Sequence, residues 1–443
     1  MMKSIHITSL GCPKNFVDSE VMIGLLEKDG WQIEEKPESA GVLLINTCGF
    51  IQPAVEEGIE EILGLAAYKK QAPATKLVVT GCMVQRYREK LLIEIPEIDL
   101  MIGTEGVQDI HMRLAELLKK EGDDKIYMPD RFLMNAAIPR RLATPFYRAW
   151  MKITEGCNNR CSYCMIPSIR GELRSREIDD LAAEAMILED GGVKELTLIA
   201  QDLTAYGTEH RTNSLLIPLL QELLAKTSLP WLRLLYLYPS GVTDDLLQLM
   251  AENSRIVPYL DIPFQHVSNS VLKRMNRRYT IDTLLDLVER TRKHLPDIAL
   301  RTTFLLGFPG ETEDDIFQLE GFIKNVKIDH VGVFAYANEE GCPSEFFPHQ
   351  VEEHEKNIRV EHILSVQSDI SEEVQRKYLG KVLPVLVEGV SRETDLLLEG
   401  RTRYQAPDID GCVYINDGNA SAGDIVEVEI SDSQVYDLVG AIV

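Results

Sequence analysis

Three cysteines close together in the middle of the chain are the residues best suited to chemistry. Cys157, Cys161 and Cys164 have the spacing C-x3-C-x2-C and follow a strand-like run at 149–154. A short loop that folds back on itself brings three such thiolates together. This arrangement suits three irons of a cubane iron-sulfur cluster and leaves the fourth iron without a protein ligand. That open iron is able to bind a substrate or a cofactor.

A zinc site and a disulfide are the alternatives for these thiols. A structural zinc ion needs a fourth Cys or His ligand, and no His lies within 40 residues on either side of the loop. A disulfide is typical of secreted chains, and the N-terminus does not have the layout of a secretory signal. The pattern therefore favours an iron-sulfur cluster.

The loop resembles the cluster-binding loop of the radical S-adenosylmethionine (SAM) enzymes, with Tyr163 at the aromatic position before the last cysteine. The resemblance implies a 4Fe-4S cluster whose open iron chelates SAM and whose electron cleaves SAM to a 5′-deoxyadenosyl radical. A cofactor is needed for such a reaction because no side chain can abstract hydrogen from an unactivated C–H bond.

A second set of three cysteines lies near the N-terminus. Cys12, Cys48 and Cys82 each stand just beyond a predicted strand, and their spacings of 36 and 34 residues each match one βα unit. The C-terminal ends of successive parallel strands meet at the crevice where open α/β sheets bind ligands. Three ordinary half-buried thiols are the alternative. The positions predict a second metal site.

The surroundings of these three cysteines resemble the N-terminal domain of the methylthiotransferases, a radical-SAM subgroup, and the resemblance covers essentially the whole chain. It implies that Cys12, Cys48 and Cys82 hold a second 4Fe-4S cluster. Within the subgroup, the stretch 9–20 is similar to the enzymes that modify a ribosomal protein. The enzymes that modify tRNA tend to have Gln and Met at the positions of Pro13 and Lys14.

Three polar residues of the central region are candidate SAM contacts by this resemblance. Gln201 and Asp202 follow a predicted strand where the family holds the amino group of SAM. Arg176 matches an arginine that the family places near SAM. The alternatives are a helix cap for Asp202 and a solvated arginine at a helix start for Arg176.

Two later loops supply the remaining candidates. Gln265 lies in the stretch Leu-Asp-Ile-Pro-Phe-Gln-His, a loop that lines the active site in this subgroup. Gly307 and Pro309 belong to a Gly-x-Pro-Gly-Glu turn that the resemblance places near the adenosyl group of SAM. An ordinary Gly-Pro turn is the alternative for this second loop.

The elements that must position these residues are predicted from periodicity. The first part alternates short β-branched runs with amphipathic stretches, which predicts an α/β domain with a flavodoxin-like open parallel sheet. Six strand-and-helix units follow and predict a partial (β/α)6 radical-SAM barrel rather than a closed barrel of eight units. The predicted strands of these two parts are 4–9, 42–46, 77–80 and 99–102, then 149–154, 195–200, 231–236, 258–262, 299–306 and 331–336.

The last part of the chain changes character after a long polar helix near 352–378. Short strands between Gly and Asp turns predict a small antiparallel β-barrel, and this part resembles the TRAM domain, which binds RNA in several relatives. Its predicted strands are 382–390, 396–399, 411–415 and 424–430. The predicted domains are 1–125, a linker at 126–147, the radical-SAM domain at 148–376 and the TRAM domain at 377–443.

Composition and charge restrict the partners. The chain has 443 residues, 45% of them hydrophobic and 26% charged, as in soluble globular proteins. We expect a cytoplasmic protein without a membrane partner, because no apolar run approaches the roughly 18 residues of a membrane span. A net charge of −24 argues against broad phosphate binding. Residues 381–443 hold four basic and 12 acidic residues, a net of −8, which favours a basic protein partner over tRNA.

The resemblance implies methylthiolation of the β-carbon of one aspartate in the S-twelve protein of the small ribosomal subunit. One SAM molecule then serves as methyl donor and a second as radical source, and an electron donor and a sulfur donor are required. The alternative is methylthiolation of adenosine in tRNA. A more remote alternative is a non-catalytic iron-sulfur carrier, which has no need for a barrel with a SAM-type loop.

Overall fold

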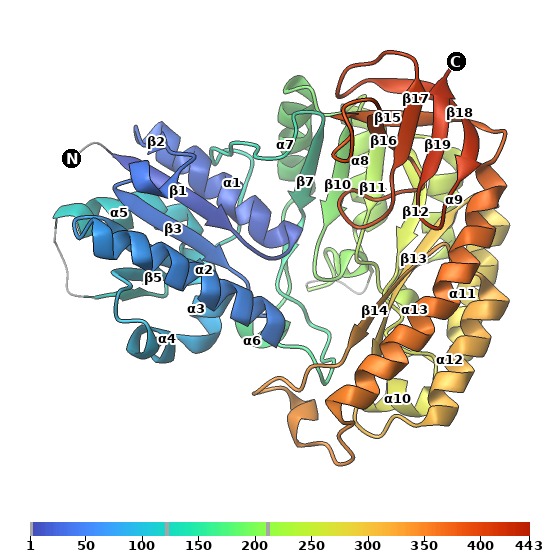
Figure 1. Cartoon of the computed structure of the whole chain (residues 1–443), viewed down its shortest axis with the longest axis horizontal. Helices are drawn as coiled ribbons and strands as arrows, with labels where there is room; N and C mark the ends of the chain where they lie inside the picture. Colours follow the sequence, from blue (N-terminus) through green and yellow to red (C-terminus); the bar gives the residue numbers. More distant parts are fainter. Residues whose placement is uncertain (1–2, 120–123, 210–212) are drawn as a thin grey trace.

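The structure is a computed structural model that describes residues 3–119, 124–209 and 213–443. Its elements form three parts, which Figure 1 shows in blue to cyan, in green through yellow to orange, and in red. Apolar strands that alternate with amphipathic helices build the first two parts, and short strands between turns build the third.

An open parallel sheet forms the N-terminal domain. Its order is β2-β1-β3-β4-β5-β6, which is the flavodoxin-like order with one strand added at the far edge. β3 is buried at all six positions, as expected for a strand that helices cover on both faces. The strands are β1 (Ser4–Ser9), β2 (Gln32–Ile33), β3 (Val42–Thr47), β4 (Lys76–Gly81), β5 (Leu100–Ile102) and β6 (Ile126–Tyr127). The helices are α1 (Pro13–Lys28), α2 (Gln52–Gln71), α3 (Cys82–Tyr87), α4 (Glu89–Glu94) and α5 (Ile110–Lys119).

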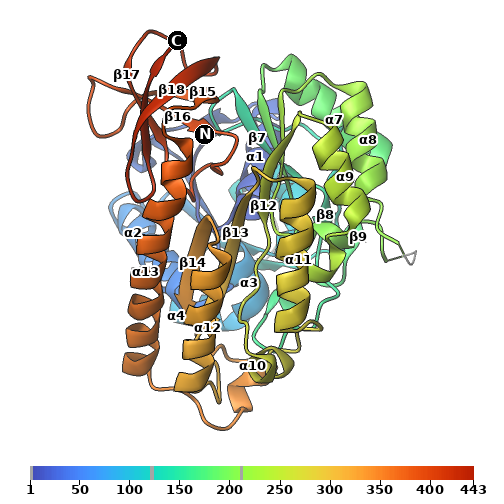
Figure 2. The same cartoon turned by 90° about the vertical axis from the view of Figure 1, so that its right-hand side faces the viewer.

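The central domain is a second open parallel sheet, in the order β14-β13-β12-β11-β10-β7. Helices α11, α12 and α13 run along its outer side (Figure 2). The strands are β7 (Arg148–Lys152), β10 (Glu195–Ile199), β11 (Trp231–Leu234), β12 (Ile256–Asp261), β13 (Ala299–Leu306) and β14 (His330–Ala335), and a small pair is formed by β8 (Thr154–Glu155) and β9 (Arg174–Ser175). The helices are α6 (Ile166–Ile169), α7 (Ile178–Asp190), α8 (Leu216–Lys226), α9 (Asp244–Glu252), α10 (Asn269–Arg274), α11 (Ile281–His294), α12 (Glu313–Val326) and α13 (Glu353–Gln375).

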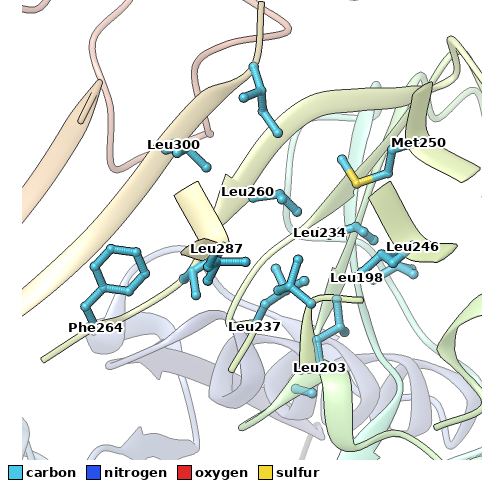
Figure 3. Packing of buried hydrophobic residues seen from close by; sticks show 14 of the residues in the cluster. Leu198, Leu203, Leu234, Leu237, Leu246, Met250, Leu260, Phe264, Leu287 and Leu300 are labelled. Carbon is cyan, nitrogen blue, oxygen red and sulfur yellow. The ribbon is translucent and has the colours of Figure 1, made fainter. Parts of the chain in front are cut away.

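Leucine side chains fill the core between this sheet and its helices. Leu198, Leu234 and Leu260 come from three neighbouring strands and lie near Leu246 and Met250 of α9 (Figure 3). Burial of each such side chain stabilises the fold by roughly 1.5–3 kcal/mol. No helix within the described ranges combines the length and apolar character that crossing a membrane requires.

A closed five-stranded barrel forms the C-terminal part, in the order β15-β16-β17-β19-β18. Four of its strand pairs are antiparallel, but β17 and β19 are parallel. The barrel is therefore not wholly antiparallel as predicted, because the chain crosses from β17 to β18 before it returns to pair β19 with β17. The strands are β15 (Val382–Val390), β16 (Leu398–Thr402), β17 (Val413–Asp417), β18 (Ile425–Ser433) and β19 (Leu438–Ile442).

The strands β2, β6, β9 and β19 lie outside the predicted ranges, and all of them except β19 have only two residues. β19 contains Gly440, which weakens a strand pattern, yet a side chain at this position would collide with the backbone of Glu429 in β18. β6 lies at 126–127, within the predicted linker, and pairs with β5 through only two residues. The predicted domain limits stay a prediction.

One apolar cluster joins all three parts. It contains Val21 of α1, Trp150 of β7, Trp231 of β11, Leu386 of β15 and Ala406, all of them buried. Because this cluster crosses the domain boundaries, the three domains pack against one another through a shared apolar interface.

Candidate active site

A cavity of about 370 Å³ lies between the N-terminal domain and the central domain. It receives residues from the loops after β1, β3 and β4 on one side and from the loops after the central strands on the other. All six cysteines that the sequence identifies as candidate ligands line it. They form an N-terminal triad (Cys12, Cys48 and Cys82) and a loop triad (Cys157, Cys161 and Cys164). The structure thus brings two separately predicted groups into one cavity.

Three strand ends position the N-terminal triad. Cys12 precedes α1, Cys48 follows β3, and Cys82 is the first residue of α3. Gly11 has a φ of 92°, and a Cβ atom there would lie 2.8 Å from the Cβ atom of Cys48. Only glycine tolerates both this conformation and this close approach, so Gly11 lets the first two loops meet.

Burial and one arginine set the electrostatics of the N-terminal triad. Burial raises the pKa of Cys48, and it raises the pKa of Cys82 to about 11, although Arg170 acts in the opposite direction. Nε of Arg170 donates a hydrogen bond to Sγ of Cys82 at 3.3 Å. A cation beside the sulfur favours the thiolate, which is the form that ligates iron.

Hydrogen bonds to residues 171–173 and to residues 274–276 position the loop triad. The backbone N–H of Cys157 donates to the carbonyl of Gly171 at 3.1 Å, and the side-chain oxygen of Asn158 accepts from the backbone N–H of Leu173 at 3.0 Å. Gly156 has a φ of 75° and lies against the carbonyl of Glu172. The loop therefore folds back on itself, as its spacing predicts.

Burial also dominates the loop triad. It raises the pKa of Cys157 to about 11 and the pKa of Cys164 to about 12. Thiols of this kind release protons when they bind a metal, so metal binding at the loop triad is coupled to pH.

The donor sets fit cubane clusters. Each triad offers three thiols on the wall of a cavity, and the described residues contain no group of three or more His, Cys, Asp or Glu arranged around a single metal ion. In a cubane cluster each thiolate binds a different iron, so the three sulfurs need not converge on one point. A cubane cluster held by three thiolates would have one iron without a protein ligand.

Gln201 and Asp202 lie at the cavity beside the loop triad. Asp202 accepts a hydrogen bond from Nδ2 of Asn159 at 2.7 Å and from the backbone N–H of Thr204 at 3.0 Å, and burial raises its pKa. It therefore caps a short helical turn and lines the cavity at once. Nε2 of Gln201 donates to Glu155 at 3.2 Å, whereas its Oε1 atom is buried without a hydrogen-bond partner. These oxygens suit a ligand that donates hydrogen bonds.

Tyr163 and Gln265 complete the predicted residues on the wall. The Tyr163 ring meets Phe308 edge to face at 6.4 Å between ring centroids. Gln265 has a φ of 68°, and its backbone is held by β13, with its N–H donating to the carbonyl of Thr303 at 2.7 Å. A positive φ at a residue other than glycine is strained and is found most often at functional sites.

Three predicted site residues do not line this cavity. The guanidinium of Arg176 is buried in ion pairs with Asp180 at 2.7 Å and Glu184 at 2.5 Å. Gly307 and Pro309 form a turn away from the cavity wall, where the backbone N–H of Gly307 donates to Glu311. The predicted SAM contacts of these three residues stay predictions.

The sequence reasoning missed several residues on the wall, among them Lys14, Arg170, Tyr236 and Arg277. The guanidinium carbon of Arg277 lies 4.9 Å from the centroid of the Tyr238 ring. Lys14 stands two positions from Cys12, which is a signal in the sequence. Arg170 and Arg277 carry no comparable signal, because only the folded chain brings them to the cysteines.

Buried ion pairs fix the two domains to each other beside the cavity. Asp18 of α1 pairs with Lys152 of β7 and, at 2.8 Å, with Arg170. Glu155 accepts from Lys152 at 2.8 Å and from Arg170 at 3.3 Å, and these side chains are at most 7% exposed. Since separation of the domains would leave the buried carboxylate of Asp18 without its cations, these ion pairs oppose a change in the spacing of the triads.

Three family profiles match the chain. "Uncharacterized protein family UPF0004" matches residues 4–103, "Radical SAM superfamily" matches 151–323, and "TRAM domain" matches 379–443. These ranges follow the N-terminal domain, the central domain and the C-terminal barrel.

Similar proteins match over nearly their whole length. A protein of Desulfotalea psychrophila named "ribosomal protein uS12 methylthiotransferase RimO" is 58% identical to this chain over 99% of each. A protein of the same name from Geotalea uraniireducens is 46% identical over 100% of this chain and 98% of the relative.

Among solved structures, the radical S-adenosylmethionine methyltransferase TsrM from Kitasatospora setae is similar with a TM-score of 0.57. It is 15% identical and covers 76% of this chain and 75% of its own. At this identity the similarity concerns the fold alone.

Proposed function

We propose that this chain, which belongs to the RimO family of ribosomal protein uS12 methylthiotransferases, adds a methylthio group to the β-carbon of one aspartate of uS12. Membership of this family makes the chain a radical-SAM methylthiotransferase that uses SAM and a 4Fe-4S cluster. We further propose that the reaction takes place in the cytoplasm, with one SAM as methyl donor and a second as radical source.

One observation carries the proposal: both triads line the same cavity. A reaction that removes hydrogen from a carbon and then attaches sulfur needs two centres that reach the same carbon. Two open irons that face one space meet this requirement, whereas a carrier of clusters has no use for it. Proximity within a closed site also protects a radical from water.

We assign the radical-generating 4Fe-4S cluster to the loop triad and a second 4Fe-4S cluster to the N-terminal triad. When bound, these groups supply the electron that cleaves SAM and the site that carries the sulfur to be transferred. Arg170 supports the assignment of the second cluster, because its hydrogen bond to Cys82 stabilises a thiolate ligand.

We assign SAM to the part of the cavity beside the loop triad. The unpartnered Oε1 atom of Gln201 and the carboxylate of Asp202 accept hydrogen bonds from the amino group of SAM. Arg277, which forms no ion pair with a described Asp or Glu, lies near enough to offer its charge to the SAM carboxylate. Tyr163 and Gln265 form the adjoining walls. In this arrangement the chain's own polar groups hold both charged ends of the amino acid portion.

The C-terminal barrel supports a basic protein as substrate. Of the four basic residues in 381–443, Arg401 is buried against Glu195 of the central domain, and Arg403 donates to backbone carbonyls of the same domain. The exposed surface of the barrel therefore keeps few cations, while many of its acidic residues are exposed, including Glu393, Asp395, Asp417, Glu427 and Glu429. An acidic surface attracts a basic protein and repels RNA.

The test compares two substrates in one assay. The protein is reconstituted anaerobically with iron and sulfide, then incubated with SAM and dithionite and either uS12 or bulk tRNA, and the products are analysed by mass spectrometry. We expect the mass of one methylthio group on uS12, and no gain when the target aspartate is replaced by alanine. A gain on tRNA alone would refute the proposal. The electron donor and the sulfur donor of the cell are separate partners that this assay replaces by chemicals.

A further inference from the structure

One buried cation differs from all the others that the structure describes. Eight Lys and Arg residues are buried within the described ranges, and seven of them form ion pairs with Asp or Glu. The seven are Lys152, Arg170, Arg176, Arg233, Lys356, Arg359 and Arg401. The eighth, Lys14, has no such partner among the described residues. A buried charge is costly without an opposite charge, so this position calls for an anionic ligand.

Lys14 reaches from the N-terminal domain to the central domain. Its Nζ atom lies 3.6 Å above the centroid of the Tyr236 ring and 3.4 Å from the carbonyl oxygen of Ala200. Both Lys14 and Tyr236 line the cavity that contains the two triads. The ammonium group therefore lies at the wall of the space where the substrate carbon must lie, close to Cys12.

The ring beneath the ammonium group is held in a strained conformation. Tyr236 has a φ of 63°, which is unfavourable for a bulky residue. Its backbone N–H donates to Asp261 at 3.1 Å, and Asp261 is paired with Arg301 at 3.2 Å. Buried groups thus maintain the strain, as is typical of functional sites. The π-face attracts the cation but leaves its hydrogen-bonding capacity largely unused.

The other cations on the cavity wall have different surroundings. Arg170 is already neutralised by Asp18 and Glu155. Arg277 lies among tyrosine rings next to the loop triad, where the proposed function places SAM. On the side of the cavity formed by the N-terminal triad, Lys14 is therefore the described cation that no carboxylate neutralises. We assign that triad to the sulfur carrier.

We infer that the Lys14 ammonium binds the side-chain carboxylate of the substrate aspartate, an inference that rests on the proposed function. The reacting β-carbon of aspartate is one bond away from that carboxylate. A charge-assisted hydrogen bond to Lys14 therefore fixes the β-carbon between the two triads and selects aspartate over its uncharged analogue asparagine.

The test measures peptide binding to the reconstituted protein in the presence of SAM and without reductant. The probes are two fluorescent peptides that span the target loop of uS12, one with the native aspartate and one with asparagine in its place. Wild type is compared with Lys14→Met, which removes the charge at similar length, and with Lys14→Arg, which retains it. Lys28→Met is the matched control, since Lys28 lies exposed in the last turn of the same helix.

We expect Lys14→Met to weaken binding of the aspartate peptide by roughly 10- to 100-fold, the loss of one charged hydrogen bond. Its binding of the asparagine peptide should match that of wild type, Lys14→Arg should restore most of the preference for aspartate, and Lys28→Met should behave as wild type. Equal weakening for both peptides, together with a lower iron content, would show that Lys14 only balances the charge of a cluster and would overturn the inference. Unchanged binding of the aspartate peptide by Lys14→Met would overturn it as well.

The outcome is separable from that of the proposed function. If wild type transfers no methylthio group to uS12, the proposed function fails, whereas the peptide comparison still reports whether Lys14 recognises the carboxylate. If wild type modifies uS12 and Lys14→Met retains the preference for aspartate, only the inference fails.

Discussion

The two triads differ in how much chain separates their members. The loop triad lies within residues 157–164 of one loop, which hydrogen bonds to residues 171–173 and 274–276 hold in place. The N-terminal triad is spread over residues 12–82 and exists only when three strand ends have come together. The comparison shows that the two halves of one cavity depend on different kinds of structure. Local spacing builds the loop triad, and the packing of a whole domain builds the N-terminal triad.

Replacing the triads in turn gives the largest expected contrast. Alanine at all three positions of the N-terminal triad should leave roughly four of about eight irons per chain and retain 5′-deoxyadenosine formation, because the loop triad remains intact. Alanine at all three positions of the loop triad should abolish 5′-deoxyadenosine formation. Iron and sulfide analysis together with chromatography of the SAM products measures both effects. Four irons in wild type and in both variants would mean that the comparison is wrong.

The buried ion pairs between the domains should stabilise the fold more than an exposed ion pair does. Asp18→Ala leaves the buried cations Lys152 and Arg170 with Glu155 as their only carboxylate, which should cost about 3 kcal/mol of unfolding free energy. Urea denaturation measures this cost. Asp29→Ala is the control, since its ion pair with Lys3 is exposed and should contribute less than about 1 kcal/mol. Equal effects of both variants would contradict the structure.

Substitution of one glycine should affect the N-terminal triad and spare the loop triad, with a smaller effect than replacement of the cysteines. Gly11→Ala introduces strain at a φ of 92° and displaces Cys48, so iron bound to the N-terminal triad should fall while 5′-deoxyadenosine formation persists. Gly30→Ala is the control, because its φ of 80° gives a similar strain of roughly 1–2 kcal/mol but a side chain there meets no atom within 4 Å. Iron content per chain distinguishes the variants, and a similar loss in both would rule out crowding of Cys48 as the cause.

A substitution of Glu195, which lies away from both triads, should have the smallest effect on the reaction. It should instead change the pH dependence of the stability of the fold. Burial acts to raise the pKa of Glu195, but Arg401 and Arg233 outweigh it and lower the pKa to about 2. The folded state thus holds its proton less tightly than the unfolded state, whose pKa is near 4.5. The stabilisation is complete above about pH 4.5 and declines as the pH falls toward 2.

Thermal denaturation of wild type and Glu195→Gln across this pH range measures the effect. The variant should be less stable at neutral pH, and the difference in melting temperature should shrink as the pH falls from 4.5. Iron content at neutral pH should be the same in both proteins, because Glu195 begins β10 at the end opposite the cysteines. A difference in melting temperature that stays constant across the range would contradict the assignment.

The sequence predicted most of the fold because both sheets repeat a simple unit. Apolar runs of strand length followed by amphipathic stretches located the central strands of both domains. It also singled out the six cysteines that line the cavity, since one set is local and the other coincides with the βα repeat, while their role as cluster ligands stays a prediction. The strand β19 was not predicted, because its glycine lowers the strand propensity of the segment. The glycine is needed for close packing against β18.

The remaining features of the site depend on contacts between distant parts of the chain. Arg170 is 88 residues from Cys82, and no local pattern connects them. Arg140 crosses from the linker region to Glu20 of α1 and Glu184 of α7, again without a pattern of its own. Charge pairing of this kind is decided by the folded surfaces, so a motif search does not find it.

Helix α1 has a consequence for the catalytic cycle. It starts directly after Cys12 and carries both Asp18 and Glu20. Asp18 pairs with Lys152 of the central domain, and Glu20 pairs with Arg140 of the linker region. A hinge motion that opened the cavity would pull these carboxylates away from their cations. The helix therefore links the position of Cys12 to the packing of the two domains. A domain opening of this kind would therefore have to take the buried carboxylates of α1 away from their cations at each turn of a cycle, which is costly.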